Sequence, residues 1–175
     1  MSDTTTIALI GLSGAGKSTV ARLLGERLGT DALDLDAAIE MHAGASVAQI
    51  FEREGEAGFR RREHDRLSTV LGDPPGVLAC GGGVIVERGS RDLLRTTCRV
   101  VWLDVSPADA AHRLANGAGV RPLLSEGPSK LEALLVERRG WYEQAAELRV
   151  LTDGRTPAQV ADEVIARLGL GGAVA

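Results

Sequence analysis

The sequence predicts an α/β protein in which helices cover both faces of a parallel sheet. Two observations lead to this prediction. Apolar segments with strand character alternate with amphipathic segments along the chain, which is typical of repeated strand–helix units. In addition, residues 11–19 read Gly-Leu-Ser-Gly-Ala-Gly-Lys-Ser-Thr and fit the pattern G-x-x-x-x-G-K-[ST] of a phosphate-binding loop without a mismatch.

The composition of the 175 residues is that of a globular protein, with 44% hydrophobic and 25% charged residues and a net charge of −4. We expect residues 1–170 to form one domain and 171–175 to be a disordered tail. The acidic balance argues against a nucleic-acid surface, and no apolar run is long enough to cross a membrane. Cys80 and Cys98 lie in apolar runs, so we expect reduced thiols in a cytoplasmic protein. We also expect the protein to be a monomer.

The phosphate-binding loop lies between a predicted strand at 7–10 and a helix that begins near Val20. Its glycines let the backbone approach an anion, and the helix N-terminus adds partial positive charge. We expect Lys17 to reach the β- and γ-phosphates of a bound nucleotide, and the Ser18 hydroxyl can supply a ligand to Mg²⁺. The expected ATP-binding residues of this loop are Gly14, Ala15, Gly16, Lys17, Ser18 and Thr19.

A second strand is predicted over 32–36, where Asp34 and Asp36 alternate with leucines and therefore share one face. In open α/β sheets, ligands bind beyond the carboxyl ends of the strands. Asp34 is therefore a candidate ligand for Mg²⁺, directly or through water. Asp36 either binds and deprotonates an acceptor hydroxyl or caps a helix that begins at Ala37.

A capping box at 46–49 begins the next helix, and a third strand over 77–80 leads into Gly81-Gly82-Gly83. This strand carries no Asp or Glu, so the carboxylate for a metal has to come from elsewhere, which favours Asp34. The three glycines either offer N–H groups to a small substrate or form a loose joint. Of the consecutive arginines 60–62, at most two can face one cleft on a helix.

A fourth strand is predicted over 98–105, a helix begins after Ser106, and a long helix begins at Ser129. A short strand over 149–151 and a helix capped by Thr156-Pro157 complete the fold. Arg121 lies in a glycine-rich segment, as a lid residue that closes over phosphates would, or it is a solvated loop arginine. Arg155 precedes the last helix and is a candidate to border the nucleotide base.

Taken together, these motifs resemble those of shikimate kinases from residue 7 to about 168. The resemblance rests on the phosphate-binding loop, on Asp34-Leu35-Asp36, on Glu54-Gly55-Glu56 with Phe59-Arg60, on Gly81-Gly82-Gly83, on Arg121-Pro122-Leu123-Leu124, and on Arg138 with Tyr142. It implies a three-layer P-loop kinase fold with five parallel strands in the order 2-3-1-4-5. It also implies a substrate-binding helical segment at about 37–63 and a flexible lid at about 114–125.

The resemblance further implies transfer of the γ-phosphoryl group of ATP to the 3-hydroxyl of shikimate. Lys17, Asp36 and Arg121 would be catalytic, and Ser18 and Asp34 would bind Mg²⁺. Arg113, Arg121 and Arg155 would complete the ATP site. The residues that would hold shikimate are Asp36, Arg60, Gly81, Gly82 and Arg138, with Arg139 as an alternative to Arg138.

Three other functions remain open at this stage. A gluconate kinase shares the phosphate-binding loop and also acts on a hydroxylated carboxylate. The sequence disfavours a nucleotide-binding module without catalysis, because it keeps Lys17, Ser18, Asp34 and Arg121. A nucleoside monophosphate kinase needs an element that reads a second base, and the sequence contains no clear one.

Overall fold

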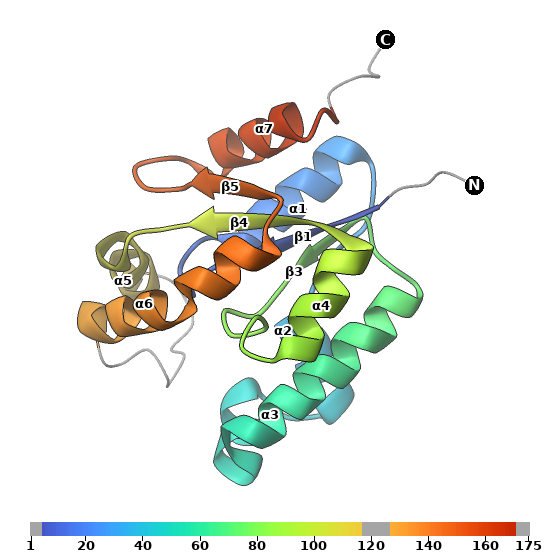
Figure 1. The fold of residues 1–175 in the computed structure, drawn as a ribbon, viewed down its shortest axis with the longest axis vertical. Coiled ribbons are helices and arrows are strands. Elements are labelled where there is room, and N and C mark those ends of the chain that lie inside the picture. The colour runs from blue at the N-terminus through green and yellow to red at the C-terminus, as the bar shows by residue number, and fades with distance from the viewer. Residues whose placement is uncertain (1–4, 117–126, 171–175) are drawn as a thin grey trace.

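The computed structural model describes residues 5–116 and 127–170 (Figure 1). The strands of its central sheet are β1 (Thr6–Ile10), β2 (Ala32–Asp34), β3 (Val77–Ala79), β4 (Cys98–Asp104) and β5 (Leu148–Leu151). All neighbouring strands are parallel, and their order is β2-β3-β1-β4-β5, as predicted. The arrowheads of β4 and β5 in Figure 1 mark the edge where the carboxyl ends of the strands meet.

Helices flank this sheet on both faces (Figure 1). In the described residues they are α1 (Lys17–Leu28), α2 (Leu35–Ala43), α3 (Val47–Gly72), α4 (Arg88–Thr97), α5 (Pro107–Asn116), α6 (Gly127–Ala145) and α7 (Pro157–Arg167). Helices α1 and α7 pack together on one face, whereas α4 and α6 pack together and contact β4 from the other face. None of the helices within 5–116 or 127–170 has the length and apolar character that a membrane span requires.

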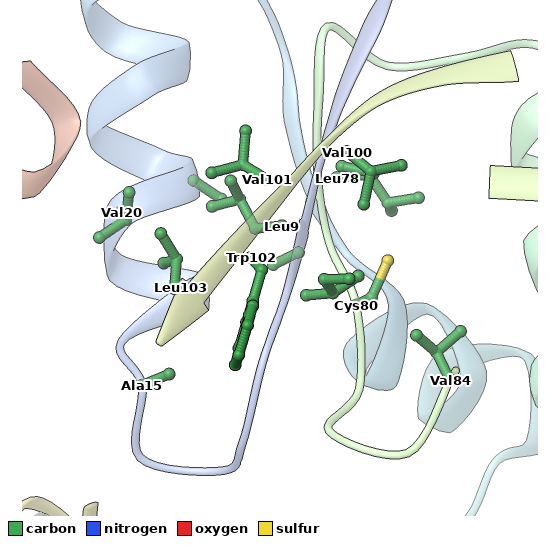
Figure 2. Packing of buried hydrophobic residues seen from close by; sticks show 14 of the residues in the cluster. Leu9, Ala15, Val20, Leu78, Cys80, Val84, Val100, Val101, Trp102 and Leu103 are labelled. Carbon is green, nitrogen blue, oxygen red and sulfur yellow. The ribbon is translucent and has the colours of Figure 1, made fainter. Parts of the chain in front are cut away.

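The core lies on both faces of the two central strands, β1 and β4. Figure 2 shows Val101 and Leu103 pointing toward Val20 of α1, whereas Val100 and Leu78 lie on the opposite face. Because successive side chains alternate across a strand, a strand buried on both faces has to be apolar throughout. This requirement explains the nearly unbroken apolar run of β4. Trp102 is buried within it, and Cys80 and Cys98 are free thiols.

The boundary between β2 and α2 differs from the prediction. The predicted strand over 32–36 ends at Asp34, and Asp36 lies in the first turn of α2. The cause is the Asp34 carboxylate, which accepts a hydrogen bond from the Ala37 backbone N–H at 3.1 Å and so caps the helix two residues earlier than expected. The alternative interpretation of Asp36 as the helix cap is therefore wrong, because Asp34 has that role.

Helix α3 is broken at Gly55, which has φ 68° and ψ −178°. A positive φ is readily adopted by glycine and costs other residues free energy, so the glycine allows two helical pieces to meet here. The first piece begins with the predicted capping box, in which Ser46 and Gln49 exchange hydrogen bonds. The second piece directs Phe59 and Arg60 toward the carboxyl ends of β2 and β3, where they line the acceptor cavity described below.

Candidate active site

The phosphate-binding loop connects β1 to α1. Gly16 is the N-cap of α1, with φ 89°, and Gly14 has φ 84°. An added Cβ at Gly11 would stand 2.3 Å from the Leu103 carbonyl oxygen, and one at Gly14 would stand 2.7 Å from that of Ala110. The loop therefore packs against the end of β4 and against α5 so closely that side chains do not fit at these positions.

Lys17 begins α1, and its side chain is buried within the loop. Its ammonium group donates hydrogen bonds to the carbonyl oxygens of Gly11 at 2.9 Å and Leu12 at 2.8 Å. The side chain also lines the cavity in front of the loop. This placement puts a positive charge where the N–H groups of the first turn of α1 point, as binding of a polyphosphate requires.

Ser18 and Asp34, the two predicted metal ligands, are in direct contact. The Ser18 hydroxyl donates a hydrogen bond to Asp34 Oδ2, while Asp34 Oδ1 caps α2. A hydroxyl and a carboxylate are oxygen ligands of the kind that Mg²⁺ prefers, with water and phosphate oxygens completing the octahedron. In the described residues, no group of three or more His, Cys, Asp or Glu side chains could hold a metal ion. The pair fits a nucleotide-bound Mg²⁺ rather than a metal held by the protein alone.

A cavity of about 480 Å³ lies in front of the loop and is the candidate nucleotide site. Arg113 and Arg155, both expected to belong to the ATP site, line it. Arg113 donates to the Thr152 hydroxyl at 3.1 Å and to the Gly14 carbonyl at 3.4 Å, which joins α5 to the loop. Arg155 donates to the Leu151 carbonyl at 3.0 Å. The backbone and side chains of other elements therefore hold both guanidinium groups at the cavity.

A second cavity, of about 560 Å³, adjoins the first and is the candidate acceptor site. Ser13, Asp34 and Asp36 line both cavities, so the two share a wall at the carboxyl ends of β1 and β2. The other predicted substrate residues that line the second cavity are Arg60, Gly81, Gly82 and Arg138. The structure thus brings together all the predicted acceptor residues, which come from α2, α3, α6 and the segment after β3.

Glu63 also lines the acceptor cavity, and the sequence interpretation missed it. It accepts a hydrogen bond from Arg60 Nη1 at 2.6 Å, and only 1% of its side chain is exposed. Burial raises the pKa of Glu63 to about 7, an effect that the positive charge of Arg60 opposes. The sequence does contain a signal for Glu63. It lies three residues after Arg60, and residues three apart lie on the same side of a helix. Arg60 also bonds Glu56 at 3.4 Å.

Gly81 is the point where two carboxylates approach the backbone after β3. A Cβ added there would stand 2.7 Å from Asp36 Oδ1 and 2.7 Å from Glu63 Oε1. At Gly83, an added Cβ would stand 2.1 Å from Arg60 Nη2. The acceptor side chains therefore lie directly against the glycine segment, which explains why this segment has no side chains.

Arg138 lies on α6, and its Nη1 donates to the Gly82 carbonyl at 3.1 Å. Arg139 is exposed and places its guanidinium 6.0 Å from the centre of the Trp102 ring, outside both cavities. The geometry therefore favours Arg138 over Arg139 as an acceptor residue. Arg62 pairs with Glu54 at the surface, as expected for part of the arginine run. Arg121 and most of the predicted lid fall outside the described residues.

Comparison with known proteins places these features in a family. A family model described as shikimate kinase matches residues 13–169. A shikimate kinase from Symbiobacterium thermophilum is 44% identical over 167 residues, which are 93% of this chain and 95% of the relative. One from Mycobacterium tuberculosis is 42% identical over 163 residues, 91% of each chain.

Solved structures agree with this result. The shikimate kinase from Acinetobacter baumannii in complex with shikimate has a TM-score of 0.88 and 34% identity, and covers 97% of this chain and 96% of its own. A gluconokinase from Sinorhizobium meliloti, with a TM-score of 0.60, 19% identity and coverage of 95% and 93%, shares the fold. On the strength of the family model and of relatives that match over nearly their whole length, the chain belongs to the shikimate kinase family.

Proposed function

We propose that the protein transfers the γ-phosphoryl group of ATP to the 3-hydroxyl of shikimate, with release of ADP and shikimate 3-phosphate. One observation carries this proposal beyond family membership. The nucleotide and acceptor cavities meet at Ser13, Asp34 and Asp36, next to the phosphate-binding loop. An acceptor hydroxyl in the second cavity is thereby brought close to a phosphoryl group in the first, and such positioning supplies much of the rate enhancement in phosphoryl transfer.

On the nucleotide side, the loop amides and Lys17 bind the phosphates, and Arg113 and Arg155 border the base. Ser18 and Asp34 would hold Mg²⁺, which supplies positive charge to the β- and γ-phosphates. Asp34 is kept in place by its second role as the cap of α2. Arg121 is assigned to the transferring phosphoryl group as a cation that balances its developing charge.

On the acceptor side, Arg60 and Arg138 bind the carboxylate of shikimate. An arginine presents two parallel N–H donors to a carboxylate, and such pairs are stronger than neutral hydrogen bonds. Asp36 accepts a hydrogen bond from the attacking hydroxyl and takes its proton as the O–P bond forms. Gly81 and Gly82 let the ring of the substrate approach the backbone.

The proposal includes a monomer in the cytoplasm with ATP and shikimate as its small-molecule partners. The residues from 114 to 125 are assigned to a lid over the nucleotide. Neither nucleic acid nor a membrane is part of the proposed activity.

Measuring ADP release with Mg·ATP and shikimate, gluconate or AMP in parallel tests this function. Of the three acceptors, we expect only shikimate to support ADP release. The Lys17→Met variant, which keeps an unbranched side chain but removes the ammonium group and its charge, is the control that assigns ADP release to this site. Turnover with gluconate or AMP instead of shikimate would refute the proposed acceptor.

A further inference from the structure

We propose that Tyr142 is a positioning residue that holds the glycine segment 81–83 in the shape that binds the acceptor. Tyr142 lies on α6 and takes no part in the chemistry proposed above. The inference rests on the proposed function, because it concerns the same acceptor site.

The contact that carries the inference is a hydrogen bond from the Tyr142 hydroxyl to the Gly82 carbonyl, at 2.8 Å. Arg138 Nη1 donates to the same oxygen at 3.1 Å. A carbonyl oxygen has two lone pairs, so these two donors from α6 use both of them. The orientation of the Gly82 peptide and the position of the Arg138 guanidinium are therefore set together.

The opposite side of Gly82 faces the phosphate-binding loop. A Cβ added at Gly82 would stand 3.1 Å from Ser13 Oγ and 3.2 Å from the Ser13 backbone nitrogen. The Gly82 peptide thus lies between Ser13 and the two donors of α6. Ser13 is also one of the residues that both cavities share. A shift of Gly82 toward the loop, and so away from α6, would break both hydrogen bonds to its carbonyl oxygen.

The hydroxyl itself has little freedom to move. The Tyr142 side chain is fully buried, and its ring stacks on Trp102 of β4 with centroids 5.4 Å apart and planes at 16°. Trp102 is in turn only 1% exposed. Burial raises the pKa of Tyr142 to about 12, so the hydroxyl remains a donor at neutral pH. The central sheet thereby provides a fixed base for the glycine segment.

The Tyr142→Phe variant tests this inference, because it removes one hydroxyl and keeps the buried ring. We expect the KM for shikimate to rise about tenfold, as for loss of a buried hydrogen bond worth about 1.4 kcal/mol. The KM for ATP and kcat should change by less than about threefold, because the glycine segment lines the acceptor cavity only.

Amide hydrogen exchange provides a second measurement that needs no substrate. The Val84 N–H donates to the Gly81 carbonyl at 3.2 Å, and the Val86 N–H donates to that of Gly83 at 3.0 Å. In Tyr142→Phe, we expect both amides to exchange about tenfold faster than in the wild type. If the variant does not fold, the wild type can still refute the inference, because a segment that is held in place requires these two amides to be protected without ligand, and rapid exchange of both would overturn it.

Thr6→Val is the matched control. Thr6 is buried in β1, and its hydroxyl donates to the Pro75 carbonyl at 2.7 Å, at the amino end of the sheet far from both cavities. The Thr6→Val variant loses the same kind of hydrogen bond as Tyr142→Phe. We therefore expect a similar fall in stability, with unchanged KM values and unchanged amide exchange at Val84 and Val86.

The outcomes separate the inference from the proposed function. If the wild type phosphorylates shikimate and Tyr142→Phe leaves the KM for shikimate unchanged, the inference is wrong and the function stands. If Tyr142→Phe raises both KM values and lowers kcat alike, Tyr142 has only a structural role. If the wild type does not phosphorylate shikimate, the proposed function is wrong. Independently of activity, unchanged amide exchange at Val84 and Val86 in Tyr142→Phe would overturn the inference.

Discussion

Replacing Glu63 by glutamine should change how the stability of the protein depends on pH. The Glu63 carboxyl is almost completely buried, and its pKa is about 7, compared with 4.5 for an exposed carboxyl. The folded protein therefore binds this proton more tightly than the unfolded chain does. The associated stability is fully present below pH 4.5 and is lost as the pH rises through about 7. Glutamine has nearly the same shape and no charge at any pH.

The size of the effect follows from the two pKa values. Each tenfold change in proton affinity corresponds to about 1.4 kcal/mol, so a rise from 4.5 to about 7 corresponds to about 3 kcal/mol. We therefore expect the free energy of unfolding of Glu63→Gln, minus that of the wild type, to increase by about 3 kcal/mol between pH 4.5 and 8. Taking the difference cancels the titration of all other groups that the substitution leaves undisturbed.

Urea denaturation at closely spaced pH values measures this difference directly. Glu56→Gln is the control, because Glu56 bonds the same arginine at 3.4 Å but its side chain is 60% exposed. The Glu56→Gln substitution removes a contact with Arg60 but no buried carboxyl, so it shows how much of the change comes from losing a partner of that arginine. A difference between Glu63→Gln and the wild type that stays constant with pH would refute the reasoning that burial of the Glu63 carboxyl opposes its ionisation.

The other predictions concern activity. Asp36→Asn should lower kcat for shikimate by at least about 10²-fold, because the amide cannot take the proton, and calorimetry should show unchanged ATP binding. Near-normal turnover would contradict the role of Asp36. Arg60→Ala should raise the KM for shikimate by about 10²-fold with little change in the KM for ATP, and the exposed neighbour Arg61→Ala should change neither. Ser18→Ala should increase the Mg²⁺ concentration needed for half-maximal activity, and an unchanged Mg²⁺ titration would remove Ser18 from the metal site.

The arrangement of the sheet was predictable from the sequence because it depends on patterns that are local or shared by the family. The phosphate-binding loop is specified by consecutive residues, and the apolar run of β4 follows from burial on both faces. The boundary at Asp34 was not predictable in this way. Alternation of leucine and aspartate over 32–36 is compatible with a strand, and only the hydrogen bond to Ala37 decides in favour of a helix.

Glu63 and the choice between Arg138 and Arg139 depended on tertiary contacts. Glutamate is rarely buried, so a sequence gives little reason to place Glu63 in a cavity. Glu63 is buried because α3 packs against the glycine segment, which brings the Glu63 carboxyl next to Gly81. Adjacent arginines on a helix face different directions, but the direction of each is known only once α6 is placed against β4.

The wall that the two cavities share has a consequence for inhibitors. Because Ser13, Asp34 and Asp36 line both cavities, a single molecule can occupy both without passing through solvent. In a bisubstrate compound that joins a nucleotide to a cyclic hydroxy acid, binding of one half holds the other at a high effective concentration. The group that joins the two halves would lie against Ser13, Asp34 and Asp36, so it has to be compatible with the two carboxylates there.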